Sequence, residues 1–295
     1  MRILVTGGSG MVGKHLKEIL PDAIYISSKD GDLRDPVFVR WLLSSYTPDV
    51  VIHLAARVGG IKDNISKPVD YFNDNILINT NVLKYSHEYN VKRFIGILST
   101  CIYPSVVNKY PMTEEDLFLG PPPKTNFTYA YSKRCLAVAI DAYNKQYNTK
   151  YNYLTACNLY SEHDDFNNLD KMHFITSLLY KIKNCKDNQI NLLGTGNPLR
   201  QFMYAGDLAQ VIKLVIEKDI YESFNVATPE NLSIKEMANK AVSILSKDIE
   251  INFKNPELDG EFRKDVSSDL MLKYLPNFEF TKFNQGIKKV YDKIS

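Results

Sequence analysis

The chain lacks the features that mark membrane, disulfide-rich or nucleic-acid-binding proteins. Its 295 residues include only four cysteines and one tryptophan, and 36 basic against 34 acidic side chains leave a net charge of +2. This balance gives no reason to expect a nucleic-acid partner. No apolar run is long enough to span a membrane, and a strand-like segment at the N-terminus leaves no room for a signal peptide. We therefore expect a cytoplasmic protein without a membrane or nucleic-acid partner.

The cysteines and histidines also lack metal-binding patterns. Cys101, Cys135, Cys157 and Cys185 show no CxxC spacing, and no pair of the five histidines has the spacing of a zinc protease. We therefore predict no metal and reduced thiols, of which Cys135, Cys157 and Cys185 are structural.

A glycine-rich turn follows the first apolar run. Residues 2–6 read as a buried strand, residues 14–20 have helical composition, and Gly7, Gly10 and Gly13 lie between them. Such glycines allow a tight turn, close approach of a pyrophosphate, and close packing of helix on strand. The predicted cofactor contacts in this turn are Gly7, Gly8, Ser9, Gly10, Met11, Val12 and Gly13.

The end of the second expected strand, at residues 23–26, indicates which nicotinamide cofactor is bound. Ser27, Ser28 and Lys29 stand where an acidic residue would bind a free ribose 2′-hydroxyl. Two hydroxyls and an ammonium suit a 2′-phosphate, so the sequence favours NADP(H), although Asp30 follows directly. Asp32 and Leu33 are expected near the adenine.

Strand-like and helix-like segments alternate along the first half of the chain. Strands are predicted at 50–53, 94–98 and 153–157, and helices at 36–45, 69–89 and 128–147. This alternation predicts an α/β fold with a doubly wound parallel Rossmann sheet. Within it, His53 reads as a satisfied core residue and Trp41 as a packing anchor of its helix.

The pattern loosens after about residue 160. Helices are expected at 171–184, 207–217 and 283–294, a strand at 189–193, and a capping box at 233–236 that opens another helix. The prediction is an NADP-binding Rossmann domain over 1–160, with return segments from the later chain. Residues 161–295 then form mainly a smaller C-terminal α/β substrate lobe.

A phenol and an ammonium are spaced for proton chemistry. Tyr129 and Lys133 are four residues apart, which places them on one face of a helix. A neighbouring ammonium favours the phenolate, so we expect Lys133 to lower the pKa of Tyr129. Ser99 precedes them at a strand end, and Cys101 adds a second possible acid or base that hydride transfer to a ketone does not require.

These motifs resemble the extended short-chain dehydrogenase/reductases, and within them the branch that epimerises and reduces nucleotide-linked keto sugars. The resemblance covers essentially the whole chain and rests on the strings at 7–13, 54–60, 98–104, 129–133, 163–167 and 194–202. The glycine turn and the YxxxK motif occur throughout the superfamily. The Ser-Thr-Cys run with a histidine on a later helix is more specific.

The resemblance implies roles for individual residues. It makes Ser99, Tyr129 and Lys133 the reductase triad, and Cys101 and His173 the epimerisation pair. The further implied cofactor contacts are Leu54, Ala55, Ala56, Ile97, Leu98, Ala156, Asn158, Leu159 and His173, besides Tyr129 and Lys133. The implied substrate contacts are Lys181, Leu193, Arg200 and Asp259.

The activity implied is conversion of GDP-4-keto-6-deoxy-D-mannose to GDP-L-fucose by an NADP-dependent 3,5-epimerase/4-reductase, in a homodimer. Two departures leave the sugar and the base open. Leu193 stands where the family usually has an aromatic residue, and residues 156–166 replace a proline, a Gly-Pro and an asparagine. The alternatives are an enzyme for a UDP- or dTDP-linked 4-keto-6-deoxy sugar and a non-catalytic NADP-binding regulator.

Overall fold

A computed structural model describes residues 1–166 and 172–294. Its centre is a parallel six-stranded sheet with the strand order β2-β1-β3-β4-β5-β9. The strands are β1 (Ile3–Thr6), β2 (Ile24–Ile26), β3 (Val50–His53), β4 (Arg93–Ser99), β5 (Asn152–Ala156) and β9 (Phe224–Val226). The order reverses direction beside β1, as expected for a doubly wound Rossmann sheet, so the predicted fold class is confirmed.

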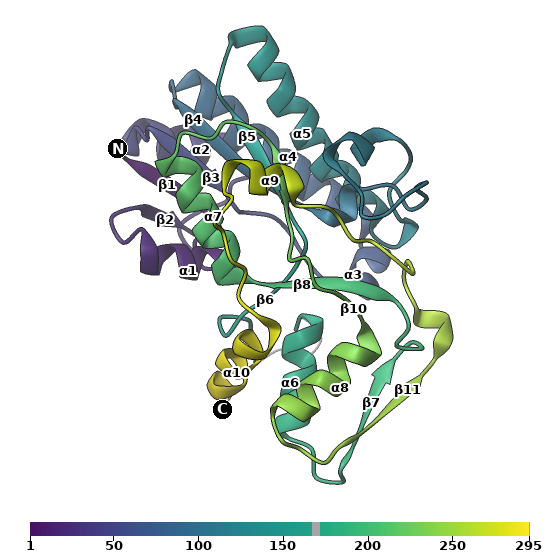
Figure 1. Cartoon of the computed structure of the whole chain (residues 1–295). Coiled ribbons are helices and arrows are strands. Elements are labelled where there is room, and N and C mark those ends of the chain that lie inside the picture. Colours follow the sequence, from purple (N-terminus) through teal and green to yellow (C-terminus); the bar gives the residue numbers. More distant parts are fainter. Residues whose placement is uncertain (167–171, 295) are drawn as a thin grey trace.

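Helices cover both faces of this sheet (Figure 1). On one face, α4 (Pro68–Glu88) contacts both α2 (Pro36–Tyr46) and α5 (Phe127–Tyr147); on the other, α1 (Met11–Ile19) contacts α7 (Ala205–Glu217). Short helical segments follow the strand ends: α3 (Ile61–Ser66), η1 (Thr100–Ile102), η2 (Glu114–Phe118) and η3 (Lys124–Asn126). The expected helices and strands of this half are present with ends moved by a few residues at most.

Trp41 corrects the prediction for α2. The helix buries Val39, Leu42 and Leu43 against the sheet. Trp41 points the other way, is 53% exposed, and stacks on Phe38 with ring centroids 5.8 Å apart. A tryptophan one position off the buried stripe of a helix cannot reach the core, so Trp41 is not the anchor that its hydrophobicity predicted.

The later chain contains more sheet than its sequence indicated. Besides β9, it contains a three-stranded sheet in the order β10-β8-β6, in which β8 pairs antiparallel with β10 and parallel with β6. A separate parallel pair joins β11 to β7. The strands are β6 (Asn158–Tyr160), β7 (Gln189–Leu193), β8 (Leu199–Tyr204), β10 (Asn231–Ser233) and β11 (Glu250–Lys254). Three-residue strands such as β6, β9 and β10 are too short to show a periodic pattern, which is why the sequence did not reveal them.

The buried apolar residues form two clusters. The larger one follows the six-stranded sheet and includes residues of α7 and of α9 (Asp269–Tyr274). The smaller one joins Tyr160 and Tyr204 to α6 (Phe174–Lys183), α8 (Ile234–Ile244) and α10 (Phe283–Lys293), which lie together below the sheet in Figure 1. Ser233 caps α8 in the predicted capping box. Lys171 of the expected 171–184 helix lies outside the described residues.

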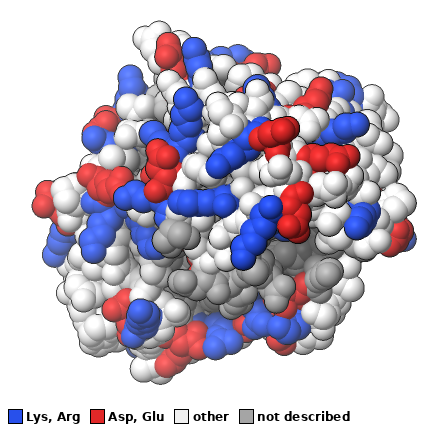
Figure 2. Space-filling view, turned by 90° about the horizontal axis from the view of Figure 1, so that it is seen from below, with Lys and Arg blue, Asp and Glu red and all other residues white. Residues whose placement is uncertain are grey.

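Charged side chains are intermixed on the face seen from below. Lys and Arg are interspersed with Asp and Glu over this face (Figure 2). Across residues 1–166 and 172–294, no helix combines the length and the apolarity needed to cross a bilayer.

Candidate functional site

The candidate site begins where β4 ends. Ser99 is the last residue of β4, and its Oγ accepts a hydrogen bond of 3.5 Å from the backbone N–H of Cys101 in the η1 turn. The Cys101 side chain is 6% exposed. Burial raises the pKa of the Cys101 thiol, against the opposing effects of the Ser99 hydrogen bond and of the Lys264 and Lys133 charges. The thiol is therefore protonated at neutral pH and lies among groups that stabilise its anion.

Lys133 reaches this strand from the first half of α5. Its ammonium donates a 3.0 Å hydrogen bond to the carbonyl of Ile97 in β4, and the residue is 2% exposed. Burial lowers the pKa of Lys133 to about 8, while the charge of Cys101 opposes that shift. A buried amine with such a pKa titrates near neutrality, unlike a solvated lysine.

Tyr129 lies one turn earlier on α5, beside Tyr71 of α4, with ring centroids 6.4 Å apart. Burial raises the pKa of Tyr129, and the charges of Cys101 and Tyr71 raise it further. The expectation that Lys133 lowers this pKa is therefore wrong in this structure. The Lys133 ammonium is engaged by the backbone of β4, and desolvation of the phenol is the largest cause of its raised pKa.

The structure brings four of the expected catalytic residues together. Ser99, Cys101, Tyr129 and Lys133 meet at the carboxyl end of β4, and electrostatic interactions connect the thiol with both the phenol and the ammonium. This is the edge of an open α/β sheet where ligands bind. An acid, a possible base and hydrogen-bond donors therefore converge at one point.

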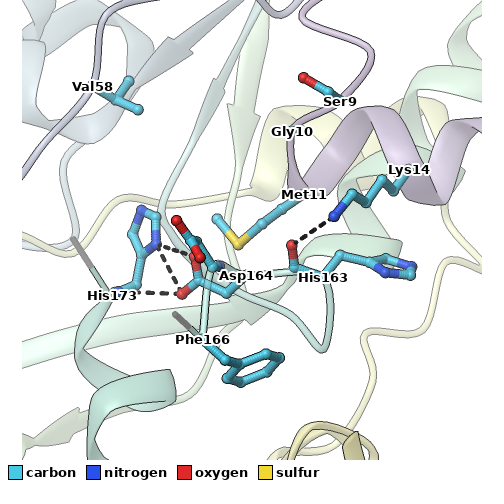
Figure 3. Close-up of a pocket in the computed structure, with 10 residues that line it drawn as sticks. Ser9, Gly10, Met11, Lys14, Val58, His163, Asp164, Phe166 and His173 are labelled. Carbon is cyan, nitrogen blue, oxygen red and sulfur yellow. Dashed lines mark hydrogen bonds and ion pairs between the residues drawn. The ribbon is translucent and has the colours of Figure 1, made fainter. Parts of the chain in front are cut away.

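His173 lies elsewhere along the same edge. It is the N-cap residue of α6 rather than part of the helix, which corrects the expectation of a helical histidine. Its Nδ1 is 3.1 Å from both carboxylate oxygens of Asp164, and its side chain is 43% exposed (Figure 3). Asp164 thereby orients the imidazole and leaves Nε2 available toward the cavity.

His173 lines a cavity of about 410 Å³ together with the glycine turn. Ser9, Gly10, Met11 and Lys14 form its other side, as Figure 3 shows. Cys101 and Tyr129 are not among the described residues that line this cavity. The expected epimerisation pair is thus split between the cavity and the end of β4.

The glycine turn has the geometry that a dinucleotide requires. Gly7 has φ +74°, and a Cβ there would lie 2.8 Å from the backbone nitrogen of Ala55. A Cβ on Gly13 would lie 2.6 Å from the carbonyl oxygen of Gly8. No side chain caps the N-terminus of α1 at Gly10, so the first N–H groups of this helix face the cavity edge and suit a pyrophosphate.

The other expected cofactor residues surround this turn. Leu54, Ala55 and Ala56 follow β3 directly, next to β1 in the sheet. Ile97 and Leu98 belong to β4, and Ala156 ends β5 before Asn158 and Leu159 of β6. The parallel strands therefore deliver all of these segments to one edge of the sheet.

The residues after β2 are already engaged with one another. The backbone N–H and the hydroxyl of Ser27 each donate a 2.8 Å hydrogen bond to the Asp30 carboxylate, while Ser28 and Lys29 are exposed. Leu33 is buried, and Asp32 forms a 2.7 Å ion pair with Arg34. Lys29 is thus accessible for a phosphate, whereas Asp30 places a carboxylate at the same turn.

Three of the expected substrate residues lie around the turn that joins β7 to β8: Leu193 ends β7, Arg200 is in β8, and Asp259 contacts the turn. Asp259 accepts hydrogen bonds from the backbone N–H of Thr195, at 2.9 Å, and from its hydroxyl. A Cβ on Gly194 would lie 2.3 Å from Asp259, so glycine is required for this contact. Burial lowers the pKa of Arg200, against the charges of Glu261 and Asp259. Leu193 ends β7 with 56% of its side chain exposed.

Lys181 is oriented by the same sheet, because its ammonium donates a 3.1 Å hydrogen bond to the carbonyl of Asn191. Two further residues were missed by sequence reasoning. Asp164 positions His173, and the charge of Lys264 acts on both Cys101 and Arg200. Neither has a spacing signal, since each meets its partner only through the fold. Of the cysteines expected to be structural, Cys157 is buried but Cys135 is exposed.

Comparison with known proteins assigns this arrangement to a family. The model of the NAD dependent epimerase/dehydratase family matches residues 3–227. A GDP-L-fucose synthase of Dictyostelium discoideum is 34% identical over 97% of this chain and 93% of its own length. A probable GDP-L-fucose synthase of Drosophila melanogaster is 31% identical over 97% and 94%.

A solved structure shows the same fold. The GDP-L-fucose synthetase of Naegleria fowleri bound to NADP has a TM-score of 0.89 and 32% identity, and the match covers 99% of this chain and 92% of that one. The glycine turn and the candidate catalytic residues at the end of β4 both lie within the residues that the family model matches. The chain belongs to the NAD dependent epimerase/dehydratase family.

Proposed function

We propose that this protein is a GDP-L-fucose synthase, which converts GDP-4-keto-6-deoxy-D-mannose to GDP-L-fucose by 3,5-epimerisation and NADPH-dependent reduction at C4. Relatives of that name match nearly the whole chain. The observation that carries the proposal is the Cys101 thiol beside Ser99, Tyr129 and Lys133. Reduction of a ketone needs no thiol, whereas epimerisation needs a second proton carrier.

The fit of the cofactor rests on the glycine turn and the uncapped N-terminus of α1. NADPH, when bound, supplies the hydride that reduces C4. Gly7 to Gly13 would hold its pyrophosphate, and the exposed Ser28 and Lys29 would contact its 2′-phosphate. Lys133, held by the Ile97 carbonyl, contacts the nicotinamide ribose.

Epimerisation precedes reduction because the C4 ketone acidifies the protons at C3 and C5. Cys101 exchanges such a proton on one face of the sugar, and His173 exchanges it on the other. Two groups are required because inversion delivers the new proton opposite to the lost one. Ser99 and Tyr129 donate hydrogen bonds to the C4 oxygen and stabilise the enolate.

Reduction uses the same donors. Tyr129 gives its proton to the C4 oxygen, and its raised pKa keeps it protonated until that step. Lys181, Leu193, Arg200 and Asp259 bind the GDP portion, with Arg200 at the diphosphate. Residues 1–160 with the returning β9 serve as the cofactor domain, and residues 161–295 supply mainly the substrate lobe.

The test is product analysis in deuterated water with GDP-4-keto-6-deoxy-D-mannose and NADPH. The parent protein should give GDP-L-fucose with deuterium at C3 and C5. Cys101→Ser and His173→Gln should lose deuterium incorporation while Cys185→Ser, at a thiol outside the site, behaves as the parent does. If both site variants incorporated deuterium as the parent does, the protein would be a simple 4-reductase.

The base of the nucleotide is tested separately, because the family's usual aromatic residue is replaced by Leu193. Thermal shift with GDP, UDP and dTDP should show stabilisation by GDP above the other two. Stronger stabilisation by UDP or dTDP would favour a sister enzyme. Absence of NADPH oxidation with every 4-keto sugar nucleotide would favour a non-catalytic NADP-binding protein.

Exposed apolar residues on α4 and α5 support a homodimer. Val69, Phe72 and Leu77 of α4 and Phe127 and Val138 of α5 are all exposed. Two such helix pairs facing each other would cover these side chains in a symmetric interface. Light scattering should show a dimer that Val138→Asp dissociates, whereas Val37→Asp on α2 does not.

A further inference from the structure

A second cluster of titratable side chains lies outside the proposed catalytic residues. His15 comes from α1, while Glu162 and His163 come from the segment after β6. One ligand atom of each of these three residues lies within 4.8 Å of the others. The His15 Nε2 is 3.8 Å from the Glu162 Oε2, and the two imidazole centroids are 4.6 Å apart.

One atom of this cluster lacks a partner. Among the described residues, the buried Oε2 of Glu162 has no hydrogen bond, although Tyr204 donates a 2.6 Å bond to the Oε1 of the same carboxylate. A buried carboxylate oxygen without a donor is costly unless a cation or a water satisfies it. This oxygen faces the His15 Nε2, which itself lies 2.9 Å from the Ser161 hydroxyl, so a cation that satisfies Glu162 here would replace that contact of His15.

The two imidazoles have polar neighbours of their own. The His15 Nε2 lies 2.9 Å from the hydroxyl of Ser161, which also accepts a 2.9 Å hydrogen bond from the backbone N–H of His163. The His163 Nε2 lies 3.1 Å from the Glu18 Oε1. Two imidazole nitrogens and a carboxylate oxygen, all donors that metals bind, therefore converge at one point.

We propose that His15, Glu162 and His163 form a binding site for a divalent transition-metal ion of the zinc type. Two imidazoles and one carboxylate are a common donor set for zinc, with water as a fourth ligand. Tetrahedral ligand atoms lie about 3.4 Å apart at ordinary zinc bond lengths. The observed separations, 3.8 Å between the His15 Nε2 and the Glu162 Oε2 and up to 4.8 Å within the cluster, are wider, so a bound ion would draw the three side chains together.

The neighbouring charges define how tightly such an ion is held. Glu18 lies 3.1 Å from the His163 Nε2 and 3.8 Å from the His15 Nδ1, so it adds negative charge at the rim. Lys289 lines the same cavity as His15 and Glu18, and its positive charge opposes the ion. Lys14 donates to the His163 carbonyl and adds a second positive charge nearby.

The ion would join two parts of the cofactor cavity. His15 is on the helix that begins at the glycine turn, and His163 directly precedes Asp164, the partner of His173. A metal at this point would fasten the 161–166 segment to α1. The site is therefore structural and distinct from the residues at the end of β4.

The experiment measures binding of ZnCl₂ alone by calorimetry and by thermal shift. The parent protein should bind one ion per chain, and its melting temperature should rise with zinc concentration. His15→Gln and Glu162→Gln should each weaken binding at least tenfold. His87→Gln, a histidine outside the cluster, should leave it unchanged, and Lys289→Gln should tighten it several-fold.

X-ray absorption at the zinc edge separates this site from binding by thiols. Nitrogen and oxygen ligands only, lost in the His15→Gln protein, support the proposal. Sulfur ligands, or equal zinc binding by the parent protein and by His15→Gln and Glu162→Gln, would overturn it. Absence of any saturable zinc binding by the parent protein would also overturn it, and the cluster would then be a hydrogen-bonded contact.

Discussion

Replacing Lys133 with methionine should stabilise the protein while it removes activity. Burial lowers the pKa of Lys133 from its ordinary 10.5 to about 8, which corresponds to about 3 kcal/mol of unfavourable free energy for the charged form. Losing the hydrogen bond to the Ile97 carbonyl costs about 1.5 kcal/mol. Methionine fills a similar volume, so the Lys133→Met protein should gain about 2 kcal/mol at pH 7.

This gain should depend on pH in a defined direction. Because the folded-state pKa is depressed, the unfolded chain binds more protons than the native protein between pH 8 and 10.5. The parent protein therefore becomes more stable as pH rises through this window, and carries the full penalty below pH 8. The advantage of Lys133→Met should fall by about 1 kcal/mol between pH 7 and pH 9.

The assay is urea and thermal unfolding of both proteins without NADPH, at pH 7 and pH 9. For a chain of this size, 2 kcal/mol corresponds to a rise in melting temperature of about 3 °C. Lys145→Met, at an exposed lysine of the same helix, is the matched control and should show no such gain. A Lys133→Met protein that is less stable than the parent at pH 7, or an advantage that does not change with pH, would refute the reasoning.

Three further predictions concern Tyr129, Lys29 and His53. Tyr129→Phe should lower the reduction rate at least about 100-fold but keep GDP binding by calorimetry; a rate within a few-fold of the parent would identify another acid. Lys29→Met should raise the KM for NADPH more than about tenfold and leave that for NADH unchanged. Equal kinetics of the parent protein with NADPH and with NADH would contradict the predicted preference for NADPH. Burial lowers the pKa of His53 to about 3, so the parent should lose about 2 to 3 kcal/mol between pH 7 and pH 4.5, because the histidine of the unfolded chain protonates first. His53→Gln should flatten this acid limb in urea unfolding, and an unchanged limb would contradict the assignment.

The glycine turn, the strands of the first half and the YxxxK spacing were predictable from the sequence. Each of these signals is local: Gly7 needs a positive φ, β3 is a continuous apolar run, and Tyr129 and Lys133 share a helix face through spacing alone. The capping box at Ser233 is local in the same sense. The alternation of strands and helices then fixes a parallel sheet, whose carboxyl edge is where the candidate residues meet.

Other features depend on contacts between distant segments, and no local pattern encodes them. The short β9 gains its place only by pairing with β5, and Asp164 meets His173 only when the segment after β6 folds back. The pKa shifts of Tyr129 and Lys133 also depend on the fold: burial raises the first, where the spacing predicted a lowered value, and lowers the second.

The same reason explains why the His15, Glu162 and His163 cluster was not expected. Its residues show no metal-ligand spacing along the chain, because they belong to two segments that are far apart in sequence. Local spacing determines which side chains share a turn or a helix face. Burial and the proximity of distant segments determine which of them exchange protons or bind ions, and those properties exist only in the folded chain.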